Sequence, residues 1–167
     1  MKIDDDHLYH GAALIQIAEH PQFTAINSFK GTLAHYENAY RINDDIAIYL
    51  KYASKPKKPH DEYVFTFTKA HLDQIRAITK AVHKTFLALV CVKAREVCCL
   101  RVEELFSLIE RRRKAFHSDE NQYSVLVTAK KGSSLHVYVN EPHKKNTRIS
   151  GKDVVVSRSA FPGELFS

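Results

Sequence analysis

The chain has 167 residues, of which 44% are hydrophobic and 26% are charged. This length predicts a single domain, residues 1–167, and the composition is rich enough in apolar residues to exclude a disordered protein. Because it contains no run of 18 apolar residues and does not start like a signal peptide, we expect a cytoplasmic protein without membrane association. The odd number of cysteines, three, fits neither a disulfide framework nor a zinc site, so we expect buried thiols.

Charge is unevenly distributed along the chain. Residues 1–50 carry three Lys or Arg against seven Asp or Glu, a net charge of −4, and residues 51–167 carry twenty-two against twelve, a net charge of +10. This division is typical of a protein that holds a reactive centre at one place and binds a polyanion around it. An ordinary solvated surface is the alternative interpretation.

The first half of the chain predicts a helix followed by four strands. Asp4, Asp5 and Asp6 can cap a helix from about residue 7 to 19, in which apolar residues recur at helical spacing. Strands are expected over 22–29, 35–43, 45–53 and 63–68, and the Asn-Asp-Asp sequence at 43–45 predicts a hairpin turn between the second and third.

The second half predicts two helices and four strands. Thr68 can cap a helix that ends near Val82, and a second helix is expected from Val102 to Phe116. Strands are expected over 85–92 and 96–102, and a last hairpin turns at residues 131–133. The fold class is therefore α/β, on the border with α+β, with a central mixed sheet and a helix on each face. We expect the core at about 7–116, and the last hairpin and tail at about 122–167.

The order of helix, strands, helix and strand, with the sequence Tyr49-Leu50-Lys51 on the second strand of a hairpin, resembles the PD-(D/E)XK nuclease-like fold of restriction endonucleases and repair nucleases. The resemblance covers residues 7–92. It implies metal-dependent phosphodiester hydrolysis on DNA, with Mg²⁺ as cofactor, in restriction or phage defence, and homodimers or larger complexes. Lys51 matches the lysine that orients or activates the attacking water, whereas Tyr49 stands where the family has Asp or Glu.

The resemblance also implies two carboxylate metal ligands. Glu37 is the acidic candidate on the preceding strand, and Glu19 is a second one, because some family members supply an acid from the first helix. A three-residue loop centred on Asp44 would place Glu37 opposite Lys51, and a two-residue loop would place Tyr36 or Asn38 near it. A cross-strand ion pair between Glu37 and Lys51, with no catalytic role, is the structural alternative.

Basic clusters are the candidate nucleic-acid contacts, because exposed cations on one face are sufficient to bind phosphates. The ten histidines are dispersed without metal-ligand spacing, so any one of them, such as His10 or His35, is expected at the surface or in packing. Two functional alternatives remain, an inactive nucleic-acid-binding module on the same fold and a protein-interaction subunit. The candidate contacts are Lys55, Lys57, Lys58, Arg111, Arg112, Arg113, Lys130 and Lys131, and Lys144, Lys145 and Arg148 form a further cluster.

Overall fold

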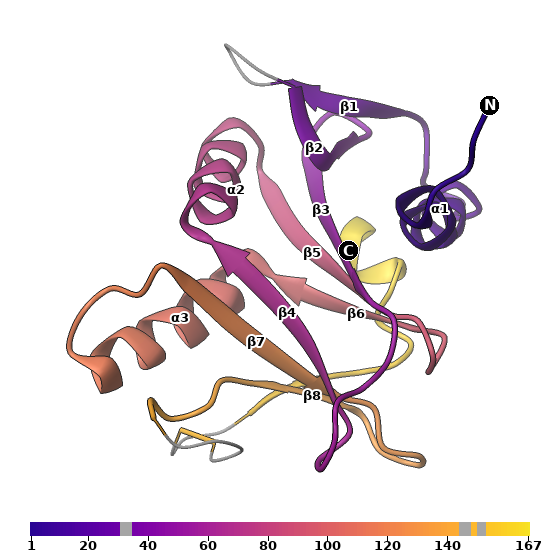
Figure 1. The fold of residues 1–167 in the computed structure, drawn as a ribbon. Coiled ribbons are helices and arrows are strands. Elements are labelled where there is room, and N and C mark those ends of the chain that lie inside the picture. The colour runs from indigo at the N-terminus through magenta and orange to yellow at the C-terminus, as the bar shows by residue number, and fades with distance from the viewer. Residues whose placement is uncertain (31–34, 144–147, 150–152) are drawn as a thin grey trace.

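The computed structural model describes residues 1–30, 35–143, 148–149 and 153–167. The chain forms two sheets that diverge from a common core, with one helix on the outer face of the first sheet and two helices at the opposite side (Figure 1). The predicted α/β class is confirmed, and the predicted cluster at Lys144 and Lys145 lies outside the described residues.

The first sheet is mixed and has five strands, in the order β1-β2-β3-β5-β6. Strands β3 and β5 are parallel and central, and the other neighbours are antiparallel. Between Ile42 and Ile46, which pair in the ladder, the chain turns through residues 43–45, so the predicted three-residue loop is confirmed. The strands are β1 (Ile26–Lys30), β2 (His35–Ile42), β3 (Ile46–Ala53), β5 (Lys84–Cys91) and β6 (Glu96–Arg101).

The central mixed sheet is confirmed, but a second sheet was not predicted, because β4 (Glu62–Thr68) leaves the first sheet. It pairs with β7 (Gln122–Thr128) and forms a separate antiparallel sheet with β8 (Leu135–Tyr138) and β9 (Val154–Val156), in the order β4-β7-β8-β9. The last hairpin, expected as an extension of the core, therefore builds half of this second sheet.

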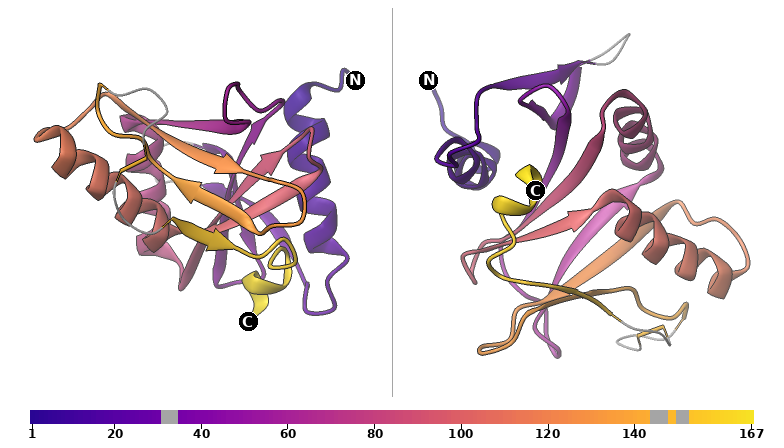
Figure 2. Two further views of the ribbon diagram at one scale, coloured as in Figure 1. Left: turned by 90° about the horizontal axis from the view of Figure 1, so that it is seen from below. Right: turned by 180° about the vertical axis from the view of Figure 1, so that it is seen from behind.

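Capping side chains begin the first two helices as the sequence predicts. Asp4 accepts a hydrogen bond from the amide of His7 at the start of α1 (Asp5–Ala18), and Thr68 does the same for His71 at the start of α2 (Lys69–Ala81). Helix α3 (Val102–Phe116) has Glu103 and Glu104 in its first turn, where they complement the helix dipole. The views of Figure 2 show α1 on one side of the first sheet, away from α2 and α3.

Alternation along β3 divides the interior into two hydrophobic clusters. Tyr49 faces the cluster shared with α2, α3 and the second sheet, whereas Ile48 and Leu50 face α1. The C-terminal tail returns to the core, because Leu165, in the 3₁₀ helix η1 (Gly163–Phe166), is fully buried in the α1 cluster. The cysteines are buried as expected, and burial raises the pKa of Cys91 and Cys99 to about 12.

Candidate functional site

Lys51 lies near the end of β3, on the face that carries Tyr49. Its ammonium group lies 5.1 Å from the centre of the Phe67 ring, and the side chain is only partly exposed. Among the described residues its Nζ atom has no hydrogen bond and no ion pair. Burial lowers the pKa of Lys51, and no nearby carboxylate opposes this shift. A partly buried cation without an anionic partner is costly to folding, which makes it a candidate functional group.

A bulge in β2 explains why Glu37 does not pair with Lys51. The β2–β3 ladder ends at the pair of Ala39 and Tyr49, one pair before Asn38 and two before Glu37. Asn38 has a φ of 63°, in the left-handed region, where the strand cannot continue regularly. Two consecutive pairs of the β1–β2 ladder show the irregularity. From one pair to the next, β1 advances by two residues, from Ser28 to Lys30, whereas β2 covers five, from Tyr40 to His35. The extra residues turn the side chains of this segment away from the ladder.

The bulge carries Glu37 into an open pocket of about 400 Å³ between β2 and α1. Asp6 and His10 of α1 line the same pocket, together with Asn38. Glu37 is exposed, and its charge contributes to the raised pKa of Tyr49, although burial is the larger cause. The predicted loop is therefore right, but the cross-strand ion pair of Glu37 and Lys51 is absent from the described residues.

His10 is the residue that sequence reasoning underestimated. It is only 6% exposed, and its Nε2 atom is buried with no hydrogen-bond partner among the described residues. It belongs to the inward face of α1 with Ala13 and Ile17, at helical spacing, and its ring packs against Tyr52 at a centroid distance of 5.5 Å. A polar residue at the position of a core residue in this stripe is the sequence signal that could have identified it.

The surroundings of His10 lower the pKa of its imidazole. Burial is the main cause, and the positive charge of Lys51 acts in the same direction, whereas Asp6 and a side-chain hydrogen bond with Asn38 oppose the shift. His71 lies on the other side of Lys51, and burial and the Lys51 charge lower its pKa too. Three basic side chains therefore have lowered pKa values, Lys51 on β3 and one histidine on each side of the sheet, His10 from α1 and His71 from α2. We call His10, Lys51 and His71 the Lys51 centre.

The two other residues implied by the resemblance lie apart from this centre. Glu19 is the exposed C-terminal cap of α1, nine residues after His10, or about 13 Å along the helix axis. Tyr49 is 2% exposed and its ring is near that of His71, so it cannot replace the missing carboxylate at the surface. The structure therefore brings Glu37, but not Glu19, to the pocket beside the Lys51 centre.

No three His, Cys, Asp or Glu side chains within the described part of the chain are arranged to hold a metal ion. Mg²⁺ needs fewer protein ligands than this, because it keeps several waters and is often bound by one or two carboxylates and a substrate phosphate. Glu37 lines the pocket between β2 and α1, whereas Glu19 does not.

Lysines from three separate turns meet at one end of the molecule. Lys58 comes from the β3–β4 loop, Lys93 from the β5–β6 turn, and Lys130 and Lys131 from the β7–β8 turn, and they line one hollow of about 510 Å³. In Figure 1 these turns lie at the lower right end of the molecule. We call this surface the basic groove. Of the sequence clusters, Lys58 from 55–58 and both lysines of 130–131 therefore line one hollow, which spacing alone could not establish, whereas Lys55 and Lys57 do not line it.

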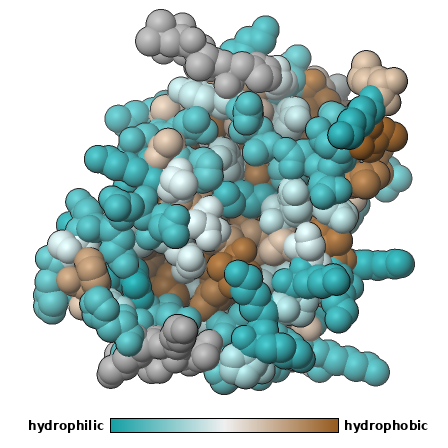
Figure 3. Space-filling view, in the orientation of Figure 1, coloured by the Kyte–Doolittle hydropathy of each residue, from teal (hydrophilic) through white to brown (hydrophobic). Residues whose placement is uncertain are grey.

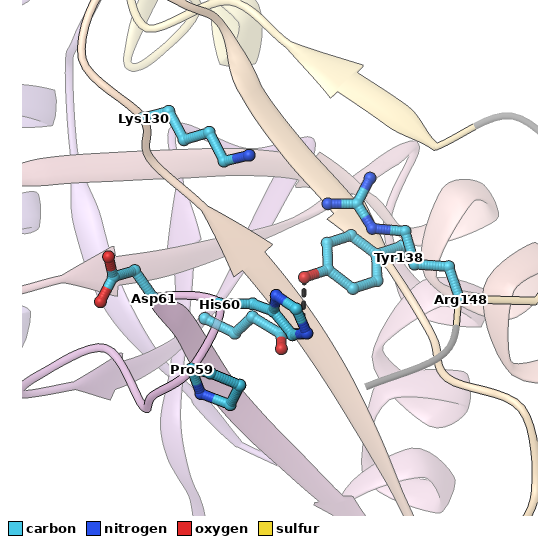
Figure 4. Close-up of a pocket in the computed structure, with 7 residues that line it drawn as sticks. Pro59, His60, Asp61, Lys130, Tyr138 and Arg148 are labelled. Carbon is cyan, nitrogen blue, oxygen red and sulfur yellow. Dashed lines mark hydrogen bonds between the residues drawn. The ribbon is translucent and has the colours of Figure 1, made fainter. Parts of the chain in front are cut away.

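A second hollow, of about 360 Å³, adjoins the basic groove, because Asp61 and Lys130 line both. Its other lining residues include Glu62, Tyr138 and Arg148. Figure 4 shows the Lys130 amine and the Arg148 guanidinium on either side of the Tyr138 hydroxyl group. The groove thus continues into a pocket with positive side chains at its rim.

The arginine cluster of α3 lies apart from the basic groove. Arg112 donates two hydrogen bonds to the Glu120 carboxylate, at 2.7 and 2.8 Å, and a third to the carbonyl oxygen of Asn140. Arg113 makes a similar pair with Glu110. Arg112 thus links α3 to residues beyond the helix, whereas Arg113 pairs within it, and much of the charge of both is neutralised locally.

Hydrophilic side chains cover most of the face in Figure 3, with hydrophobic ones exposed beside the N-terminal segment. In the N-terminal part of the chain, Ile3 and Leu8 are exposed apolar residues, at 67% and 56%. Within the described part of the chain, no helix has the length and apolar character needed to cross a membrane.

Comparison of the chain with protein families, with curated proteins and with solved structures finds no match. The interpretation of the candidate site therefore depends on its own chemistry, a partly buried lysine whose charge acts on two histidines and a basic groove formed partly by the loop that follows the strand of that lysine.

Proposed function

We propose that the protein is a DNA-acting, nuclease-like enzyme that hydrolyses phosphodiesters at the Lys51 centre. The observation that carries this proposal is the isolated ammonium group of Lys51, whose charge acts across the sheet on His10, where the Nε2 atom is buried without a hydrogen-bond partner among the described residues. Phosphodiester hydrolysis requires a positioned water and cationic groups on the phosphate oxygens. A lysine with a lowered pKa can supply a charged donor or, after losing its proton, a base for that water.

The basic groove supports a polyanionic substrate. The β3–β4 loop that supplies Lys58 follows β3 directly, and Lys51 is the third-last residue of that strand. The amide of Lys93 also bonds the carbonyl oxygen of Ser54, which joins the β5–β6 turn to the same loop. A nucleic-acid strand whose phosphates contact these lysines would therefore pass the end of the strand that carries Lys51.

Mg²⁺ belongs to this proposal as a cofactor held by Glu37 and a substrate phosphate. When bound, it would neutralise charge that develops on the phosphate oxygens. Lys51 would orient the phosphate and the attacking water, and the aromatic surface of Phe67 would limit access of bulk water to the amine.

Plasmid cleavage tests the proposal. The protein should nick or cut supercoiled DNA with Mg²⁺ or Mn²⁺, and Lys51→Ala should remove the activity while DNA binding persists. Absence of cutting with either metal, over a range of pH from 6 to 9, would exclude the enzymatic function.

A second candidate function is nucleic-acid binding without catalysis. It is favoured by Tyr49, which is buried where the resemblance expects a carboxylate. DNA binding that weakens steeply with salt, without cleavage by the wild-type protein, would support this second function over the first. Action in the cytoplasm, a role in restriction or phage defence and assembly into homodimers remain parts of the proposal.

A further inference from the structure

Glu62 is a buried carboxylate that the proposed reaction does not use. It is 5% exposed, at the start of β4, and it lines the hollow that adjoins the basic groove. The hydroxyl group of Tyr138 donates a hydrogen bond to its Oε2 atom at 2.5 Å. An ionised carboxylate has about four acceptor positions, so one hydroxyl group leaves most of them unfilled. A ligand that enters this hollow must therefore present hydrogen-bond donors to Glu62.

The rim of the same hollow carries positive side chains, which favour an anionic group in a ligand. Lys130 and Arg148 flank it, and the Arg148 guanidinium lies 3.8 Å from the centre of the Tyr138 ring (Figure 4). Arg148 is also paired with Asp153, which leaves Lys130 as the less neutralised cation at the rim. These side chains favour an anionic group beside the donor group that Glu62 requires.

A nucleotide combines these two features, because its base carries N–H donors and its phosphate carries the negative charge. Guanine fits best, since its N1–H and exocyclic amine form two parallel donors that match the two oxygens of a carboxylate. Uracil presents only one such N–H, and its neighbouring oxygens would face Glu62. The volume of about 360 Å³ exceeds that of one base. A free amino acid also joins a donor to an anion, but continuity with the basic groove favours a nucleotide.

We propose that the hollow formed by Glu62, Tyr138, Lys130 and Arg148 binds a guanine nucleotide, with the base donating hydrogen bonds to Glu62 and its phosphate facing Lys130. That this guanine nucleotide is part of a nucleic-acid strand rests on the proposed function. The hollow would give the protein a base preference at a distance from the reacting phosphodiester, and it requires no change at the Lys51 centre.

Titration with the four ribonucleoside 5′-monophosphates, followed by calorimetry, tests this assignment in the full chain. GMP should bind at least about tenfold more tightly than UMP, in line with the discrimination of a bidentate contact. Glu62→Gln should remove most of this preference. Glu103→Gln is the matched control, because Glu103 undergoes the same loss of charge but is exposed in the first turn of α3 and lines neither hollow. Its GMP affinity should stay within about twofold.

Equal affinity for the four nucleotides would overturn the assignment, and so would an unchanged preference in Glu62→Gln or tighter binding of glycine or arginine than of GMP. The wild-type ranking decides the matter even if Glu62→Gln fails to fold. DNA cleavage without nucleotide preference would contradict this inference alone. Selective GMP binding without DNA cleavage would contradict the proposed hydrolysis and leave the nucleotide site standing.

Discussion

Replacement of Lys51 by methionine should make the protein more stable and inactive. Methionine retains the length of the apolar stem but removes the charge. The cation–π interaction between Lys51 and the Phe67 ring is therefore lost, which should lower the free energy of unfolding by about 0.5–1 kcal/mol. Against this, each unit by which burial lowers the pKa of Lys51 corresponds to about 1.4 kcal/mol of penalty on the folded state. A shift of a single unit already outweighs the lost contact.

We therefore expect Lys51→Met to be more stable than the wild-type protein at neutral pH. For a chain of this size, each 1 kcal/mol of gain raises the melting temperature by about 2–4 °C. Lys69→Met is the matched control, because Lys69 is exposed at the start of α2 and its substitution should change stability by less than about 0.5 kcal/mol.

The gain should also depend on pH. The folded-state pKa of Lys51 lies below the 10.5 expected for the unfolded chain, so between these two values the unfolded state binds more protons. The wild-type protein consequently recovers stability as the pH rises through this window. The advantage of Lys51→Met should be complete below the folded-state pKa and should disappear as the pH approaches 10.5.

Urea unfolding of both variants at several pH values between 6 and 10 measures this effect. A loss of more than about 1 kcal/mol in Lys51→Met at neutral pH would refute the reasoning, because it would mean that the lysine contributes to the fold through its charge. A gain that stays constant up to pH 10 would show that packing, rather than the buried charge, is responsible.

Three further results are expected from other parts of the molecule. Replacing Lys130 and Lys131 by Ala should reduce the slope of log affinity for DNA against log salt by up to about 1.8, whereas Arg113→Ala, which removes a cation paired with Glu110, should change it little. In urea unfolding, Leu165→Ala should cost about 2–5 kcal/mol, because this side chain is fully buried against α1, and a loss below about 1 kcal/mol would contradict the packing of the tail. The three buried thiols, of Cys91, Cys98 and Cys99, have raised pKa values and should stay protonated at pH 8. A thiol reagent at this pH should therefore leave the native protein unlabelled and label it fully in urea. Rapid labelling of the native protein would contradict the burial of the thiols.

The local elements of the fold could be predicted from the sequence because each has a local cause. The cap at Thr68, the apolar spacing of α2 and the turn at residues 43–45 are determined by neighbours within a few positions. The division into two sheets could not be predicted, because the sequence of β4 predicts a strand but does not indicate which strand it pairs with. Only pairing with β7, more than 50 residues later, decides its sheet.

The candidate site was predictable to a similar extent. Lys51 stands out as a charge in an apolar strand, and the hairpin loop beside it was correctly placed. The ladder ends two pairs before Glu37, at the left-handed Asn38, and no local pattern in the sequence signals that bulge. The position of His10 in the apolar stripe of α1 was a local signal, but its relation to Lys51 was not predictable, because α1 and β3 are far apart in the chain.

The central claim is that the Lys51 centre hydrolyses phosphodiesters, and the cleavage rate of DNA tests it most directly. The rate should be measured under single-turnover conditions with Mg²⁺ or Mn²⁺ for the wild-type protein, Lys51→Met and Lys69→Met. We predict that Lys51→Met cleaves at least about 100-fold more slowly than the other two, as expected for the loss of a group that stabilises the transition state. Equal cleavage by all three proteins, or none by the wild-type protein, would contradict the claim.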